Sequence, residues 1–160
     1  MVATQALDQD VRKPSVQEIR EAAGPVRQVW PRGDFLCGPA PHHACPAIID
    51  VTGRARDLVF GPYRLLSAGV WRARVAVTVC PDAARRQLEV EFGVYPDFTR
   101  VSLPYATPGR HEIELIHTFA ADGHAEVRVI LARAAFHGEL AFDDVTVERL
   151  GDAPPVASSD

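Results

Sequence analysis

From Ile48 to Leu150, apolar and polar side chains alternate with a period of two residues. The clearest run is Trp71–Val79, in which Arg72 and Arg74 point away from the apolar set. This period is typical of β-strands with one buried and one solvated face. Similar alternation covers 88–94, 113–119, 125–131 and 140–147, with weaker candidates at 48–52, 58–66 and 99–103.

Turn-forming groups of Gly, Pro and Asp separate these runs at the spacing of short antiparallel strands. Within 140–147 the alternation changes phase at Asp143-Asp144, which predicts a β-bulge. Alternating faces without a long helix predict an all-β fold, either two packed sheets or a barrel.

The N-terminal part of the chain shows a different pattern. Ser15 and Glu18 fit a capping box that starts one short helix, over residues 16–23. Between residues 24 and 47 five prolines remove backbone donors, so no regular element is expected there. We therefore divide the chain into an N-terminal arm (1–32), a β-domain (33–150) and a disordered tail (151–160).

Length and charge narrow the function classes. A chain of 160 residues suits one domain. The formal net charge of -4 disfavours nucleic acid, whose binding is driven by phosphate neutralisation. No window approaches the roughly 18 apolar residues of a membrane span, so no membrane insertion is expected. Residues 1–10 lack the apolar stretch of a signal peptide, which predicts synthesis in the cytoplasm.

Three patches resemble one family. These are Phe60-Gly61-Pro62-Tyr63 with Gly69-Val70-Trp71-Arg72-Ala73, the stretch Leu140-Ala141-Phe142-Asp143-Asp144-Val145-Thr146-Val147, and Gly33-Asp34-Phe35. Together they resemble the jelly-roll carbohydrate-binding modules over roughly residues 33–150. The resemblance implies an antiparallel two-sheet β-sandwich of jelly-roll type that binds glycan without catalysis.

Many of these modules hold a structural calcium between a final-strand Asp and an opening-strand Glu. Asp143 matches the first of these ligands, and Leu36 stands at the place of the second. No cofactor is therefore expected, and calcium near Asp143 is the one metal that the resemblance raises.

Sugar binding uses aromatic faces for C–H groups and polar side chains for hydroxyls. Aromatic residues at predicted turns and charged residues on solvated strand faces meet this need. The candidate carbohydrate-binding residues are Tyr95, Asp97, Tyr105, Arg72, Arg74 and Glu91. In the arm, Ile19 and Trp30 are the candidate anchors to a partner protein.

Other chemistries fit less well. Cys37, His42, His43 and Cys45 do not follow a usual zinc spacing, so we interpret them as an ordinary loop, with a Cys37–Cys45 disulfide left open.

The pairs Glu89/Glu91 and Glu112/Glu114 are interpreted as cross-strand partners of arginines. Cys80 and the serines lack the setting of a nucleophile. No convergent acid, base and nucleophile set exists, so an enzyme is not expected. A small hydrolase or cupin-like barrel using His111 and His117 stays as a third option.

The leading hypothesis is a non-catalytic carbohydrate-binding module for cell-surface or capsular polysaccharide. Weak single sites gain avidity when displayed in several copies, so an oligomer or larger assembly is expected. The alternative is a structural spike, fibre or decoration component of a phage-like particle, such as a gene transfer agent, anchored by the arm and displayed on the particle surface.

Overall fold

The computed structural model describes residues 26–103 and 107–155. The helix predicted over 16–23, with Ile19, and the candidate Tyr105 lie outside these described residues. Among the residues that are described, no helix has the length and apolar character needed to cross a membrane.

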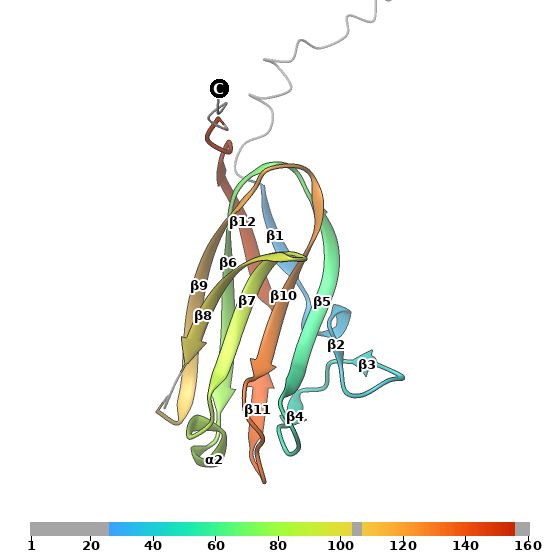
Figure 1. The fold of residues 1–160 in the computed structure, drawn as a ribbon, viewed down its shortest axis with the longest axis vertical. Coiled ribbons are helices and arrows are strands. Elements are labelled where there is room, and N and C mark those ends of the chain that lie inside the picture. The colour runs from blue at the N-terminus through green and yellow to red at the C-terminus, as the bar shows by residue number, and fades with distance from the viewer. Residues whose placement is uncertain (1–25, 104–106, 156–160) are drawn as a thin grey trace, which may run out of the picture.

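Two six-stranded antiparallel sheets pack face to face, with sheet B toward the viewer in Figure 1. Sheet A contains β1 (Arg27–Trp30), β4 (Ile48–Asp50), β6 (Gly69–Val79), β9 (Gly109–Phe119), β11 (Glu139–Phe142) and β12 (Val145–Gly151). Sheet B contains β2 (Leu36–Cys37), β3 (His43–Ala44), β5 (Arg56–Leu66), β7 (Leu88–Val94), β8 (Asp97–Leu103) and β10 (Gly123–Leu131). Two short helical turns, η1 (Arg32–Asp34) and α2 (Pro81–Ala84), complete the described elements.

The chain passes from one sheet to the other between β5 and β6, and crosses back and forth several times before β12. This confirms the predicted antiparallel two-sheet β-sandwich of jelly-roll type. The core lies between the sheets and is built from the inward positions of the period-two runs, including Trp71, Val75, Phe92 and Leu115. Each such side chain contributes about 1.5–3 kcal/mol when removed from water.

The predicted phase change at Asp143-Asp144 is a register shift along β6. Phe142 pairs with Val77 and Thr146 pairs with Arg74, so four steps on one side face three on β6. One extra residue is the definition of a β-bulge. The bulge divides the last predicted strand into β11 and β12.

The Asp143 carboxylate at this bulge accepts a hydrogen bond from Arg110. The carboxylate that the resemblance assigned to calcium is therefore paired with an arginine. Among the described residues, no group of three or more His, Cys, Asp or Glu side chains is arranged to hold a metal ion.

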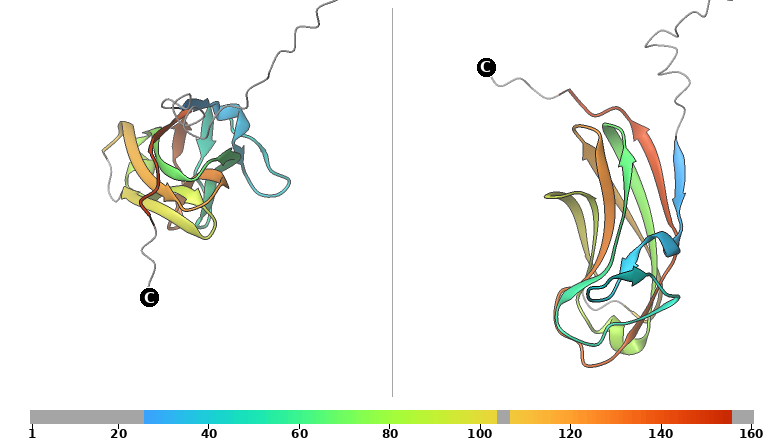
Figure 2. Two further views of the ribbon diagram at one scale, coloured as in Figure 1. Left: turned by 90° about the horizontal axis from the view of Figure 1, so that it is seen from above. Right: turned by 90° about the vertical axis from the view of Figure 1, so that its right-hand side faces the viewer.

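The prediction that 24–47 lacks regular elements is wrong, because β1, β2 and β3 all form there. The prolines flank these strands instead of interrupting them. None of the residues of Arg27–Trp30, which pair with β12, is a proline. The right-hand view of Figure 2 shows β1 along the outside of β12. The last part of the predicted arm thus belongs to sheet A.

Candidate functional site

Tyr63 occupies a bulge in the middle of β5. On β10, Ala125 pairs with Arg64 and the next residue, Glu126, pairs with Pro62, so Tyr63 is an extra residue without a partner. Its φ of 61° makes it the one non-glycine residue with a positive φ in the described part of the chain. That backbone conformation costs a residue with a Cβ about 1–2 kcal/mol. Bulges re-aim side chains, and this one leaves the Tyr63 side chain 45% exposed.

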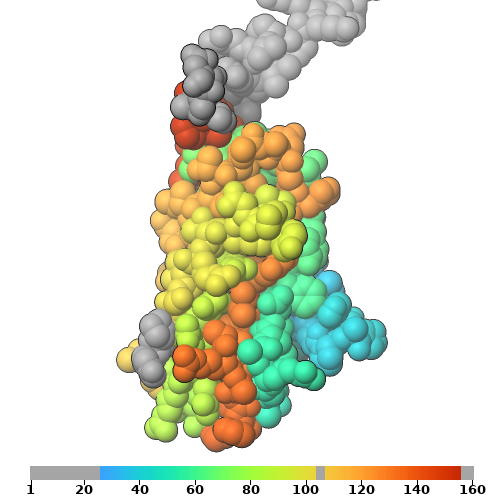
Figure 3. All heavy atoms as spheres, in the orientation of Figure 1, coloured from blue at the N-terminus to red at the C-terminus, as the bar shows by residue number. Residues whose placement is uncertain are grey.

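A groove of about 440 Å³ lies beside this bulge, between the β2–β3 connection and the outer face of β5. Its lining, which we call the β5 groove, consists of Gly38, Pro39, His42, Arg54, Arg56, Asp57, Phe60 and Tyr63. Figure 3 shows the β2–β3 segment as a protrusion beside β5, which forms the raised side of the groove.

The raised side depends on a tight turn at Gly38. Gly38 has a φ of 82°, and a Cβ added there would lie 2.5 Å from the His43 ring, so glycine is required twice over. The Gly38 carbonyl oxygen lies 2.9 Å from His42 Nδ1, and the His42 ring meets the Phe60 ring edge to face at 4.8 Å. A carbonyl can only accept, so Nδ1 carries the proton, and Nε2 is left to meet a ligand.

A charged network lies beside the groove on the same outer face of sheet B. Arg128, directly opposite Phe60, donates to Glu126 at 2.6 Å and lies 3.8 Å from Glu91. Its guanidinium also stacks over the Phe98 ring at 4.5 Å. Both glutamates are only 2% exposed, so they need this arginine to compensate their charge.

The same network shifts two groups of the groove. Partial desolvation raises the pKa of Tyr63, and the Glu126 carboxylate raises it further. Desolvation also raises the pKa of Asp57; Arg128 opposes this shift, and the carboxylates of Glu91 and Glu126 reinforce it. Tyr63 therefore keeps its hydroxyl proton, a hydrogen-bond donor, over a wide pH range.

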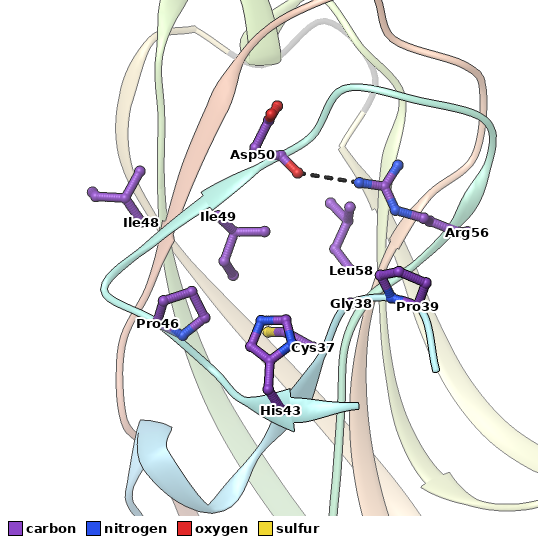
Figure 4. A pocket seen from close by; sticks show the side chains of 10 residues that line it. All are labelled: Cys37, Gly38, Pro39, His43, Pro46, Ile48, Ile49, Asp50, Arg56 and Leu58. Atoms are coloured by element: carbon purple, nitrogen blue, oxygen red, sulfur yellow. Dashed lines mark hydrogen bonds between the residues drawn. The ribbon is translucent and has the colours of Figure 1, made fainter. Parts of the chain in front are cut away.

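A second, smaller pocket of about 200 Å³ adjoins the groove and shares Gly38, Pro39 and Arg56 with it (Figure 4). Arg56 donates to the backbone carbonyls of Asp50, Val51 and Arg54 at 3.1, 3.4 and 3.2 Å. These bonds fix the turn between β4 and β5. Arg56 therefore separates the two hollows, and its charge is one of the causes that lower the pKa of Asp50 in the smaller pocket.

Cys37 lines the smaller pocket, and Cys45 lies close to it at the base of the β2–β3 connection. Both are buried free thiols. The hydrogen bond between them lowers the pKa of Cys37 and raises that of Cys45. Cys80, in contrast, caps α2, since its sulfur accepts from the Ala83 backbone N–H at 3.4 Å.

The structure distributes the predicted sugar-binding residues over three places. Arg72 and Arg74 lie on the outer face of sheet A and pair with Glu148 and Glu114. Glu91 lies on the outer face of sheet B, buried beneath Arg100 and Arg128. Tyr95, 76% exposed, and Asp97 lie at the β7–β8 turn.

The predicted anchor Trp30 has 1% of its surface exposed and packs edge to face against Phe92 inside this chain's own core. Its ring offers no free face to a partner in this structure. The paired carboxylates do meet arginines, as interpreted: Arg100 bridges Glu89 and Glu91.

Sequence reasoning missed the groove residues His42, Arg54, Phe60 and Tyr63. One signal was present, because Gly61-Pro62 inside an apolar run marks a bulge and a re-aimed neighbour. The sequence contains no comparable signal that the β2–β3 connection approaches Phe60, because that connection has no regular pattern that relates it to β5.

No protein-family model matches the sequence, and neither does a curated protein. Among solved structures, the carbohydrate-binding module TmCBM61 in complex with beta-1,4-galactotriose is similar over 77% of this chain and 88% of its own, at 10% identity and a TM-score of 0.44. A family two carbohydrate esterase from Cellvibrio japonicus is similar over 84% of this chain and 38% of its own (12% identity, TM-score 0.37). The virus-like particle of Macrobrachium rosenbergii extra small virus is similar over 97% and 96% (12% identity, TM-score 0.21).

Proposed function

We propose that the chain is a non-catalytic carbohydrate-binding module that binds cell-surface or capsular polysaccharide in the β5 groove. The observation that carries this proposal is Tyr63, an aromatic side chain held over a groove by a strained backbone. Strain of this kind clusters at functional sites, because the surrounding structure must stabilise it for a purpose other than stability.

The groove supplies both kinds of contact that a sugar needs. The rings of Phe60 and Tyr63 offer apolar faces for the C–H side of a pyranose. His42, Arg54 and Asp57 offer donors and acceptors for its hydroxyls. Convergent polar groups around an apolar floor are the usual composition of a small-ligand site.

Binding without hydrolysis agrees with the same lining. Glycoside hydrolysis ordinarily uses two carboxyl groups on opposite sides of the scissile bond. Asp57 is the one carboxylate among the residues that line the groove. The buried Glu91 and Glu126 lie beside the floor and are engaged by arginines.

Display in several copies is part of the proposal. An open groove of this size supports affinities of about 1 mM to 1 μM, or about -4 to -8 kcal/mol. Attachment to a surface then needs linked sites. Assembly through the N-terminal arm stays a prediction, since residues 1–25 lie outside the described part of the chain.

The test is binding of the full chain, coupled in several copies to beads, to an array of bacterial surface polysaccharides. We expect retention on at least one polysaccharide, and Tyr63→Ala should weaken it about tenfold, equivalent to about 1.4 kcal/mol. Tyr95→Ala, which removes an exposed tyrosine from the β7–β8 turn, is the matched control and should bind as the parent does. Retention on no polysaccharide, or loss only in Tyr95→Ala, would contradict the proposal.

A further inference from the structure

The arginines of this protein fall into two groups. On the outer faces of the sheets they are matched to carboxylates: Arg64 with Asp34, Arg72 with Glu148, Arg74 with Glu114, Arg100 with Glu91, Arg110 with Asp143, Arg128 with Glu126 and Arg149 with Asp152. The second group has no ion pair with a carboxylate among the described residues: Arg54 and Arg56 line the β5 groove, and the others are Arg27, Arg32, Arg85, Arg86 and Arg133. A chain of net charge -4 thus keeps unmatched positive charge at its candidate site.

Arg54 is the clearest case. It is exposed, it lines the groove, and its guanidinium makes no hydrogen bond or ion pair with any residue in 26–103 or 107–155. Arg56 beside it gives its donors to backbone carbonyls, which orient the side chain without cancelling its charge. Asp57 is the only acidic residue in the lining; desolvation raises its pKa, Arg128 opposes this shift, and Glu91 and Glu126 reinforce it.

From this arrangement we infer that the β5 groove selects a polysaccharide that carries carboxylates, that is, one containing uronic acid residues. The inference deepens the proposed function and rests on it. A guanidinium matches a carboxylate with two parallel N–H···O bonds, which are among the stronger hydrogen bonds in proteins. A uronate ring keeps its C–H face, so it suits the aromatic floor and Arg54 together.

The exposure of Arg54 decides how large the effect can be. A charge pair in contact with water contributes little to affinity, whereas a pair closed off from water by a bound sugar contributes more. We therefore expect the carboxylate to account for about a tenfold preference over a neutral sugar of the same shape.

The experiment uses the full chain and matched probes. Polygalacturonate, alginate and hyaluronan are each compared with their carboxyl-reduced forms, with neutral β-1,4-galactan and with dextran sulfate, in affinity electrophoresis at a fixed salt concentration. The variants are Arg54→Gln, Tyr63→Ala and the control Arg85→Gln. Arg85 lies at the end of α2, away from β3 in Figure 1, and its replacement changes the net charge equally.

We expect at least one uronate polymer to bind about tenfold more tightly than its reduced form. Arg54→Gln should remove this preference by weakening the uronate polymer more than its reduced form, and Arg85→Gln should change the binding of neither. Equal binding of acidic and neutral polymers that Tyr63→Ala abolishes would overturn the inference and leave the proposed function standing. Dextran sulfate binding as tightly as every uronate, regardless of Tyr63→Ala, would also overturn it, as attraction by charge alone. Binding to none of the polymers would overturn both.

Discussion

Tyr63 shows how the pairing of two strands can determine which side chain is presented at the surface. Its left-handed backbone follows from the extra residue that β5 carries opposite Glu126, and its ring therefore leaves the sheet toward the groove. Glycine would adopt this backbone conformation without strain. A tyrosine there indicates that the ring matters more than the stability it costs.

Two substitutions separate the ring from the backbone strain. Tyr63→Ala and Tyr63→Gly both remove the ring, and only the glycine variant relieves the φ of 61°. Tyr63→Gly should therefore be more stable than Tyr63→Ala by about 1 kcal/mol, while both lose saccharide binding to the same extent. Urea unfolding of the two variants measures the difference; an alanine variant as stable as the glycine variant would mean that the bulge is not strained.

His117 lies in the interior of the sandwich, with 5% of its surface exposed. Its Nδ1 lies 3.1 Å from the Thr99 hydroxyl, and its ring packs against Phe119. Nε2 has no hydrogen-bond partner among the described residues, although the Asp97 carboxylate lies 3.7 Å away. Burial lowers the pKa of His117 below its ordinary value of 6.5, and Asp97 opposes this shift.

This lowered pKa has a defined effect on stability. As pH falls below 6.5, the unfolded chain protonates this histidine before the folded chain does, so the unfolding free energy decreases. The slope contributed by one such proton is at most about 1.4 kcal/mol per pH unit. Unfolding of the parent and of His117→Gln between pH 7.5 and 5.5 measures it. The variant should show a flatter profile than the parent, and identical slopes in the two proteins would contradict the assignment.

At the scale of elements, β1 changes the boundary of the arm. The strand pairs with β12 over four residues and brings Trp30 into the core. A deletion of residues 1–31 would remove part of the sandwich together with the arm. Any test of the arm as an anchor must therefore remove no residue beyond 25, because the described structure begins at residue 26.

The contribution of β1 is measured by single substitutions. Trp30→Ala removes a fully buried ring and should lower the unfolding free energy by about 3–5 kcal/mol. Val29→Ala, on the adjacent exposed position of the same strand, should change it by no more than about 0.5 kcal/mol. Guanidinium unfolding followed by circular dichroism reports both values. Equal, small effects would show that β1 is only loosely attached.

The length of each strand decided whether it could be predicted from the sequence. β6, β9 and β10 are nine to eleven residues long and contain the alternating runs 71–79, 113–119 and 125–131, which are long enough to define a strand and its buried face. β1, β2 and β3 have four residues or fewer, and they form because a neighbouring strand provides a template. The residues of such a short segment do not indicate which strand will pair with it.

At the scale of the whole molecule, alternation distinguishes inside from outside but not one sheet from the other. Arg72, Arg74 and Glu91 were all correctly placed on outward positions, and the fold puts the arginines and the glutamate on opposite outer faces. The groove likewise requires a connection between β2 and β3 to meet β5. Such a site arises from topology, which a local pattern does not specify.

The proposed function places the bound saccharide in the β5 groove. The most direct measurement is a titration of the isotopically labelled full chain with an oligosaccharide of the polysaccharide that it binds, followed by amide chemical shifts. We predict that the largest shifts cluster at His42, Arg54, Phe60 and Tyr63. Shifts that cluster instead at Tyr95 and Asp97, or on sheet A around Arg72 and Arg74, would contradict the account.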